Sequence, residues 1–273
     1  MDLEEFWIKN IQSDYIGDDG AVIGESIYAM DAFWEGTHFK REWMSAKQIA
    51  YKAFMVNLSD MVAMNAQASF MMLTLAIPKD ISQDFLLELS NEFNYLAKKH
   101  NIAIIGGDTI GSDKLGISIA MIGNSKEPLF RKGVQNEHLL AYTGELGEAK
   151  RDLEKLFNGE KIASNSKFYK PILRSSFIKK ARPFLSAGMD ISDGLYCDTN
   201  KLLKANNLFL QELLVIPKEI GESGEEYEML IAFDVANLSA IKTIAKLTQT
   251  PLTIFAKASK EENKFYPCKS HHF

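Results

Sequence analysis

Residues 82–108 read SQDFLLELSNEFNYLAKKHNIAIIGGD, and this stretch sets the architecture of the first half of the chain. Apolar side chains from Phe85 to Leu96 recur at helical spacing, which predicts a helix from Ser82 to about His100. The apolar run 102–105 then predicts a strand, followed by a glycine turn and an acid at Gly106-Gly107-Asp108. Because another apolar run, 70–77, precedes the helix, we expect a strand–helix–strand unit of the α/β class.

The same alternation continues on both sides of this unit. Upstream, 26–31 is a predicted strand, and Ser45 with Gln48 forms a capping-box pattern that predicts a helix running to Asp60. Downstream, the polar stretch 123–137 is the expected domain boundary, and the mixed pattern then repeats. The predicted strands after Asp108 are 116–122, 138–143, 208–216 and 252–256, and the predicted helices are 148–157, 195–205 and 237–247. We therefore expect two α/β domains, residues 1–130 and 131–273.

Composition excludes several classes of protein. The chain has 273 residues, of which 46% are hydrophobic, so it is long enough and apolar enough to bury a core. Its net charge of -5 gives no general counter-charge for nucleic acid. The acidic N-terminus and the short apolar runs predict neither a secretory signal nor a membrane span. Two cysteines, Cys197 and Cys268, are expected to be reduced thiols in a cytoplasmic protein.

Seven aspartates fall at glycine turns or at the ends of predicted elements: Asp18, Asp19, Asp31, Asp60, Asp108, Asp190 and Asp193. Each one alone has an ordinary structural explanation, because aspartate favours turns and helix caps. Together they suggest a convergent cluster. Carboxylates that converge repel one another and need cations, and Mg²⁺ bound by carboxylates and phosphate oxygens is the usual solution. The pattern predicts a magnesium–nucleotide site.

Phosphate-binding segments are less distinct. Gly106 and Gly111 have the spacing of a Walker A loop, but Ser112 stands where the lysine is required, which excludes a P-loop. The segment 144–147 has glycines at the start of a predicted helix, where backbone N–H groups can bind phosphate, although glycines at a helix start more often form only a turn. Arg131 is either a phosphate contact or a solvated surface arginine. The acidic segment 225–228 is expected to be the first turn of a helix.

Taken together, these motifs resemble the thiamine-monophosphate kinase family, in the ATP-binding superfamily that includes aminoimidazole ribonucleotide synthetase. The matching segments occur in family order over most of the chain and are residues 17–19, 31–39, 52–64, 106–109, 190–195 and 223–228. The resemblance implies a two-domain fold with an N-terminal mixed sheet and a C-terminal α/β domain. It also implies transfer of the ATP γ-phosphoryl group to thiamine monophosphate, several Mg²⁺ ions, and a homodimer that pairs through its N-terminal strands.

The resemblance also implies roles for individual residues. The expected metal ligands are Asp19, Asp31, Asp60, Asp108, Asp190 and Asp193. The expected ATP contacts are Gly107, Asp108, Arg131 and Ser192. His38 and Glu225 fall on the side of the thiamine substrate, and no side chain is expected to act as a nucleophile or general base.

The chain departs from the family pattern at two places that bear on function. Ala29-Met30 replaces the Ser-Thr pair that usually precedes the aspartate at position 31, and the aromatic residue that covers the substrate ring falls at Ser270. Phe265 and Tyr266 are candidate replacements for that aromatic residue. Two alternatives to the kinase remain: another ATP-dependent enzyme of the superfamily, and a nucleotide- or thiamine-phosphate-binding protein without turnover.

Overall fold

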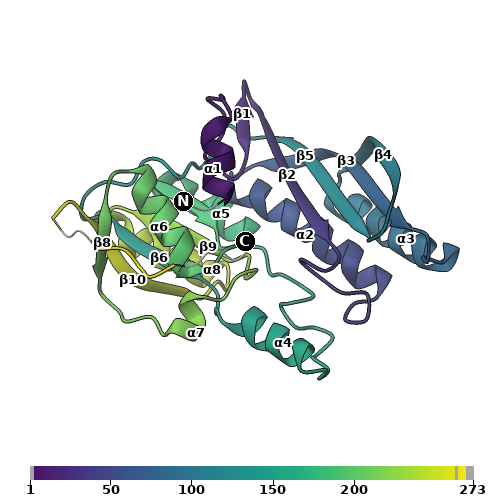
Figure 1. Cartoon of the computed structure of the whole chain (residues 1–273). Helices are drawn as coiled ribbons and strands as arrows, with labels where there is room; N and C mark the ends of the chain where they lie inside the picture. Colours follow the sequence, from purple (N-terminus) through teal and green to yellow (C-terminus); the bar gives the residue numbers. More distant parts are fainter. Residues whose placement is uncertain (1–2, 262–263, 269–273) are drawn as a thin grey trace.

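The computed structural model describes residues 3–261 and 264–268, which form two five-stranded sheets covered by helices (Figure 1). The elements up to residue 124 are α1 (Leu3–Asn10), β1 (Ala21–Ile23), β2 (Ser26–Trp34), α2 (Ala46–Ala63), β3 (Gln67–Pro78), α3 (Gln83–His100), β4 (Ala103–Ser112) and β5 (Gly116–Asn124). The later elements are β6 (Leu139–Thr143), α4 (Glu148–Phe157), α5 (Ser175–Ala181), β7 (Ala187–Asp190), α6 (Leu195–Ala205), β8 (Phe209–Glu212), α7 (Lys218–Gly221), β9 (Met229–Phe233), α8 (Leu238–Leu247) and β10 (Leu252–Ser259). Short 3₁₀ turns lie at Arg182–Phe184 and Val235–Asn237.

The first sheet is mixed and has the strand order β1-β2-β5-β3-β4. Strands β3 and β4 are parallel neighbours joined by α3, so the predicted strand–helix–strand unit is confirmed. The glycine turn predicted at 106–108 is wrong, because β4 continues to Ser112. Gly107 lies opposite Leu73, and a Cβ atom there would be 1.8 Å from the Leu73 carbonyl oxygen. Glycine is therefore required by a close backbone approach within the sheet.

The second sheet is antiparallel throughout, in the order β7-β9-β6-β10-β8. The two sheets confirm the predicted α/β class with a mixed N-terminal sheet. The strand expected over 208–216 is shorter than predicted, since β8 ends at Glu212. Strand β9 was not predicted, because its five residues are all buried and show no alternation of apolar and polar side chains.

Helix α2 lies between the two sheets (Figure 1). The predicted capping box is confirmed: the Ser45 hydroxyl accepts a hydrogen bond from the Gln48 N–H, and the Gln48 side chain accepts one from the Ser45 N–H. One side of α2 packs on β2 and β5, and the helix also contacts β7 and α5 of the second half. Because it is covered nearly all round, α2 carries apolar side chains on most of its faces.

The domain boundary near residue 130 stays a prediction. Each sheet falls entirely on one side of that boundary, but Leu156, Phe168 and Tyr169 pack into the core of the first sheet. The second half therefore also contributes to the first core. Within residues 3–261 and 264–268, no helix is both long and apolar enough to cross a membrane.

Candidate functional site

A cavity of about 390 Å³ lies where β2, α2 and the end of β7 meet, and we call it the acidic pocket. Six aspartates line it: Asp18, Asp19, Asp31, Asp60, Asp190 and Asp193. Five of these are predicted metal ligands, and they come from segments as far apart in sequence as residues 19 and 193. The fold therefore brings together most of the acids that the sequence singled out.

Helix α2 ties the acids of the two halves together. The Asn57 side-chain oxygen accepts a hydrogen bond from the Asp31 N–H at 2.9 Å. Two residues further along α2, the Ser59 hydroxyl donates to the Asp190 carboxylate at 2.6 Å. Asp60, the next residue on α2, lines the pocket between these two contacts. The segment 57–60 thus fixes a strand of each sheet relative to the pocket, a role for Asn57 and Ser59 that the sequence did not reveal.

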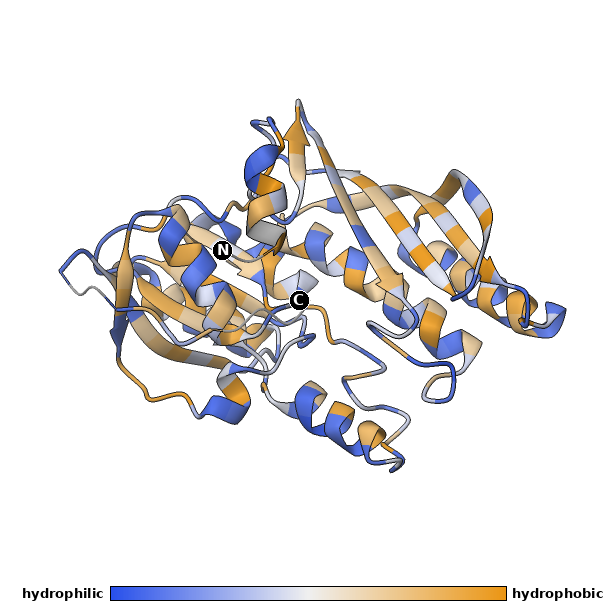
Figure 2. Ribbon diagram, viewed as in Figure 1, coloured by the Kyte–Doolittle hydropathy of each residue, from blue (hydrophilic) through white to orange (hydrophobic). Residues whose placement is uncertain are grey.

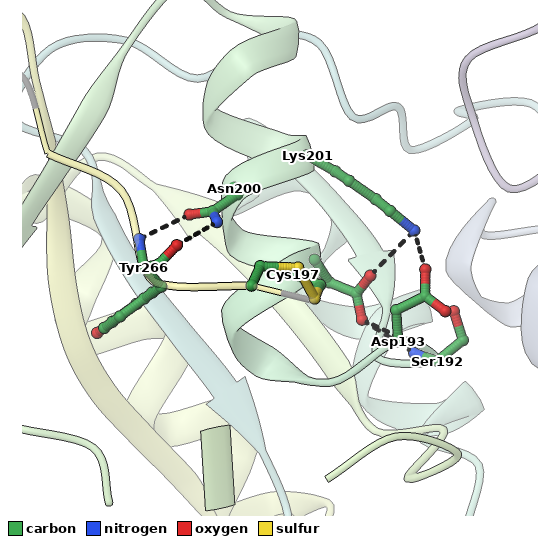
Figure 3. Close-up of a disulfide and its surroundings, with 8 residues drawn as sticks. Ser192, Asp193, Cys197, Asn200, Lys201 and Tyr266 are labelled. Atoms are coloured by element: carbon green, nitrogen blue, oxygen red, sulfur yellow. Dashed lines mark hydrogen bonds and ion pairs between the residues drawn. A yellow bond between two sulfur atoms is a disulfide. The ribbon is translucent and has the colours of Figure 1, made fainter. Parts of the chain in front are cut away.

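Two basic side chains border the acidic pocket. The Arg131 N–H donates to the Asp18 carboxylate at 2.6 Å, and its guanidinium Nε donates to Asp19 at 3.1 Å. Burial opposes the charge on Arg131, but the Asp19 and Asp190 carboxylates outweigh it and raise the arginine pKa. Lys201 contacts the Asp193 carboxylate (Figure 3). Arg131 is therefore not a solvated surface arginine, because it is bound to the acidic cluster.

Burial and mutual repulsion destabilise the negative charges of the aspartates in the acidic pocket. Burial raises the pKa values of Asp19, Asp60 and Asp190 above the usual carboxyl value. Repulsion from neighbouring carboxylates raises the pKa values of Asp60 and Asp190 further. Among the described residues, none donates a hydrogen bond to the Asp60 carboxylate. A cation placed in this pocket would remove the repulsion.

The donor set fits magnesium, which prefers carboxylate, phosphate and water oxygens. Within the described part of the chain, no three acidic, histidine or cysteine side chains are already grouped around one ion position. The protein oxygens therefore form an open arrangement. Such an arrangement suits Mg²⁺, which usually keeps several waters and is completed by phosphate oxygens.

The loop 191–194 is held by a residue that the sequence did not single out. The buried Asp198 carboxylate, on α6, accepts hydrogen bonds from the N–H groups of Ser192 (3.1 Å) and Asp193 (3.0 Å). Burial raises the pKa of Asp198 to about 7. Asp198 fixes the backbone of the predicted ATP contact Ser192, and an aspartate on a helix gives no sequence signal for that function.

A second cavity, of about 360 Å³, adjoins the first, and we call it the aromatic pocket. Its walls come from the loop 36–43, one face of α4 and the loop 222–225. His38, Ser192 and Glu225 line both pockets, so they mark the junction between them. The predicted substrate residues His38 and Glu225 therefore lie beside the predicted metal ligands.

His38 and Glu225 are each held by a specific contact. The His38 Nδ1 atom accepts a hydrogen bond from the Trp34 N–H at 2.9 Å, so the neutral ring carries its proton on Nε2. The Glu225 carboxylate accepts a hydrogen bond from Lys52 at 2.7 Å, and the Glu225 N–H donates to the Ser192 carbonyl at 2.7 Å. Lys52 was not identified as a site residue, although it is buried and directly contacts one.

Gly107 and Asp108 lie away from both pockets. Asp108 is on the edge strand β4, opposite Thr74 of β3, and it is exposed. Thr74 pairs in turn with Ser118, and Ser118 pairs with Ala32, so these side chains lie on the same face of the sheet as Asp108. Asp31 is the neighbour of Ala32 on β2 and therefore points to the opposite face. Within one chain, Asp108 is thus separated from Asp31 both by the sheet and by three strand spacings, about 14 Å.

One prediction near Glu225 is wrong. The segment 225–228 forms an irregular connection to β9, not a helix, and Glu225 and Tyr227 have positive φ values of 56° and 53°. The reason lies in the two buried acids of this segment. The Glu226 carboxylate accepts the Gly147 N–H at 2.6 Å, and Glu228 binds the Arg174 guanidinium through two 2.7 Å contacts. The Glu226 carboxylate therefore already binds a backbone N–H group at the start of α4, in the segment 144–147 where the sequence offered N–H groups for phosphate.

The expectation of reduced thiols is also wrong. Cys197 of α6 and Cys268 form a disulfide, with their Cα atoms 5.2 Å apart (Figure 3). Asn200 makes a reciprocal pair of hydrogen bonds with the Tyr266 backbone, at 2.9 and 3.0 Å. The Tyr266 ring stacks on Tyr196, with 4.2 Å between the ring centroids. Neither Phe265 nor Tyr266 lines either pocket, and Ser270 lies outside the described residues.

Comparison with known proteins gives consistent matches. Residues 17–124 match the family model described as AIR synthase related protein, N-terminal domain. The thiamine-monophosphate kinase of Buchnera aphidicola subsp. Schizaphis graminum is 32% identical over 261 residues, covering 85% of this chain and 80% of that protein. The thiamine-monophosphate kinase of Leptospira interrogans is 30% identical, covering 89% and 83%. The solved structure of AaThiL complexed with AMPPCP and TMP superposes with a TM-score of 0.86 at 22% identity, covering 99% and 96% of the two chains.

Proposed function

The chain belongs to the thiamine-monophosphate kinase family, and on this basis we propose that it transfers the γ-phosphoryl group of ATP to thiamine monophosphate. In this reaction the bond between the γ-phosphorus and the β,γ-bridging oxygen breaks. A bond from an oxygen of the acceptor phosphate to the γ-phosphorus forms, and the products are ADP and thiamine diphosphate. The observation that carries the proposal is the junction of the acidic and aromatic pockets at His38, Ser192 and Glu225.

Two pockets that share these residues suit a reaction between two phosphates. ATP and the acceptor both bring negative charge, which must be offset where they meet. The acidic pocket supplies the carboxylates for metal ions, and the neighbouring aromatic pocket leaves room for an organic group attached to the acceptor phosphate. No side chain is required as a general base, because the attacking phosphate oxygen is already ionised.

We propose that Asp19, Asp31, Asp60, Asp190 and Asp193 would hold Mg²⁺ in the acidic pocket. When bound, the metal would neutralise phosphate charge and bring the donor and acceptor phosphates together. Arg131, fixed by Asp18 and Asp19, provides a further positive group for ATP phosphate. Ser192 lies at the junction, with its backbone fixed by Asp198. The contribution of the chain is positioning and charge stabilisation.

We also propose that the protein is a homodimer that pairs through the outer face of the first sheet. Register partners Tyr28, Ile122 and Phe70 form one row across this face, and Met30, Ala120 and Met72 form the next. Tyr28, Phe70 and Met72 are 40%, 46% and 40% exposed, and Figure 2 shows apolar residues along these strands. Contiguous exposed apolar surface of this kind supports an interface.

The proposed dimer affects the roles expected for Gly107 and Asp108, which lie outside both pockets. Asp108 shares the outer face with Phe70 and Met72, and Gly107 is its neighbour on β4. Their proposed roles in binding metal and ATP therefore require a site that extends across the interface between two copies.

Phosphorus NMR of the purified chain with Mg²⁺, ATP and thiamine monophosphate tests the proposed activity. We expect the resonances of ADP and thiamine diphosphate to appear together. Binding of both substrates without product would favour a metabolite-binding protein. Failure to bind thiamine monophosphate, with ATP still bound, would favour another ATP-dependent enzyme of the superfamily.

A further inference from the structure

The aromatic pocket contains a pair of aromatic side chains to which no function has been assigned. The rings of Trp43 and Phe157 meet edge to face, with centroids 4.9 Å apart and planes at 84°. The Tyr169 hydroxyl donates a hydrogen bond to the Trp43 carbonyl at 2.9 Å, which fixes the loop that carries Trp43. On α4, Ala149, Leu153 and Phe157 recur every four residues, so one helix face is directed at the pocket. The aromatic wall is therefore supported from two sides.

This wall already accommodates a positive charge. The Lys40 ammonium lies 4.8 Å from the centroid of the Trp43 ring and 5.5 Å from that of Phe157. Both distances are within the range of cation–π attraction, which places a cation against an aromatic face. Because Lys40 is only partly buried and has a flexible side chain, a ligand with its own positive ring can replace the ammonium there.

The remaining charges in the pocket also favour a cation. Three carboxylates line it, from Glu154, Glu222 and Glu225, against the two ammonium groups of Lys40 and Lys150. Lys150 is 3.4 Å from the Glu222 carboxylate, so this pair is largely neutralised. Glu225 is likewise neutralised by Lys52, which is 2.7 Å from its carboxylate. If a ligand displaced Lys40, the negative charge of Glu154 would remain in the pocket beside the two aromatic rings. A planar heteroaromatic cation matches both properties.

We propose that Trp43 and Phe157 bind the positively charged ring system of the phosphoryl acceptor, with its phosphate directed toward His38 and Ser192. This inference rests on the proposed function, since thiamine monophosphate combines a thiazolium ring, an aminopyrimidine ring and a phosphate ester. The pocket, about 360 Å³, is within the size range of small-molecule sites. Neither Phe265 nor Tyr266 lines it. Among the described lining residues, Phe39 is almost fully buried and His38 lies at the junction, so we assign the ring contacts to Trp43 and Phe157.

Steady-state kinetics of Trp43→Leu and Phe157→Leu tests this assignment. We expect the KM for thiamine monophosphate to rise about ten-fold or more, because aromatic and cation–π contacts are lost. The KM for ATP should change by less than about two-fold, since neither side chain lines the acidic pocket. Trp43→Phe should recover most of the affinity, and an unchanged KM for ATP in the leucine variants shows that they are folded.

Thiamine, which has the rings but no phosphate, probes the aromatic pocket separately. Its inhibition constant should rise in the leucine variants by the same factor as the KM for thiamine monophosphate. In Lys40→Met the inhibition constant should fall, because a competing cation is removed. Tyr95→Leu is the matched control, since Tyr95 is an exposed aromatic residue with Lys99 5.9 Å from its ring, outside both pockets.

The outcomes separate the two proposals. If the wild-type chain forms thiamine diphosphate but Trp43→Leu and Phe157→Leu change neither the KM for thiamine monophosphate nor thiamine inhibition, the ring assignment alone is overturned. A rise in the thiamine inhibition constant in Lys40→Met would also overturn it. If the wild-type chain forms no product, the proposed function fails. Quenching by thiamine of the tryptophan fluorescence that is lost in Trp43→Leu then still tests the pocket, and absence of that quenching rejects the ring site.

Discussion

The Lys52 ammonium lies 2.7 Å from the Glu225 carboxylate, although the two residues are 173 positions apart in the chain. Lys52 is completely buried on α2, and its ammonium is also 3.8 Å from the centroid of the Phe168 ring. Glu225 has a left-handed backbone conformation, and its N–H binds the Ser192 carbonyl. This ion pair therefore connects the central helix to the loop that separates the acidic and aromatic pockets.

Lys52→Met should damage use of thiamine monophosphate more than use of ATP. The variant leaves the Glu225 carboxylate without its charge partner, and the loop at the junction loses its link to α2. We expect a higher KM for thiamine monophosphate and a loss of roughly 1–3 kcal/mol in unfolding free energy, because Glu225 stays partly accessible to water. Kinetics with each substrate and urea unfolding measure both effects.

Lys47→Met provides a matched comparison on the same helix. Its ammonium is 3.5 Å from Glu92, but its side chain is 64% exposed, so the change should alter stability by less than about 1 kcal/mol. Equal effects of the two variants on the KM for thiamine monophosphate would contradict a specific role for the Lys52–Glu225 pair.

Asp60→Asn should abolish turnover without unfolding the protein. Burial and then repulsion from the neighbouring carboxylates raise the Asp60 pKa, so removing this carboxylate should leave folding without metal unimpaired or slightly improved. Thermal unfolding with and without Mg²⁺ tests this, and the stabilisation by Mg²⁺ should shrink in the variant. Asp84→Asn, in the first turn of α3, is the control. Full activity of Asp60→Asn would exclude Asp60 as an essential metal ligand.

Folding stability should fall as the pH rises from about 4 to about 7, in part because of Asp198. Burial raises its pKa from 3.8 to about 7, so over this interval the folded state binds more protons than the unfolded state. The unfolding free energy then decreases with pH, by on the order of 3 kcal/mol for this group. Urea unfolding between pH 4 and pH 8 measures the slope, which should be smaller in Asp198→Asn. If the unfolding free energy of Asp198→Asn changed with pH as steeply as that of the wild type, Asp198 would not be a cause of the pH dependence.

Reduction of the disulfide should destabilise the protein. The bond closes a loop with a sequence separation of 71, and the chain-entropy model assigns about 4 kcal/mol to a loop of this length. Denaturant unfolding with and without dithiothreitol measures the loss. The double variant Cys197→Ser, Cys268→Ser should resemble the reduced wild type and should not respond to dithiothreitol. Identical unfolding of oxidised and reduced wild type would show that the bond makes no contribution.

Phe70→Glu should separate the proposed dimer into monomers. The variant places a charge in the middle of the exposed apolar face of the first sheet, where desolvation on association would be costly. Light scattering on the eluted protein gives the mass directly. Leu87→Glu changes an exposed apolar residue on α3 and should leave the mass unchanged. A wild-type mass of one chain would reject the dimer.

Local patterns were sufficient to identify many of the elements. The capping box at Ser45 and Gln48 and the apolar spacing in α3 depend on neighbours three or four residues away, which the sequence displays directly. The buried strand β9 was missed because a short run of apolar residues without alternation is ambiguous. The lengths of β4 and β8 also depend on their neighbours in the sheet, so their ends were placed incorrectly.

The sequence by itself determined the α/β class, the family resemblance and the set of acids, because these follow from local periodicity and from motifs. Only the tertiary structure decided which acids share a pocket and which lie elsewhere. Asp31 and Asp190 meet through α2, whereas Asp108 lies on the other face of a sheet. Likewise, the Lys52–Glu225 and Cys197–Cys268 pairs join distant positions. Such contacts depend on how helices and sheets pack, and the spacing of two residues in the sequence does not show how close they lie in the folded chain.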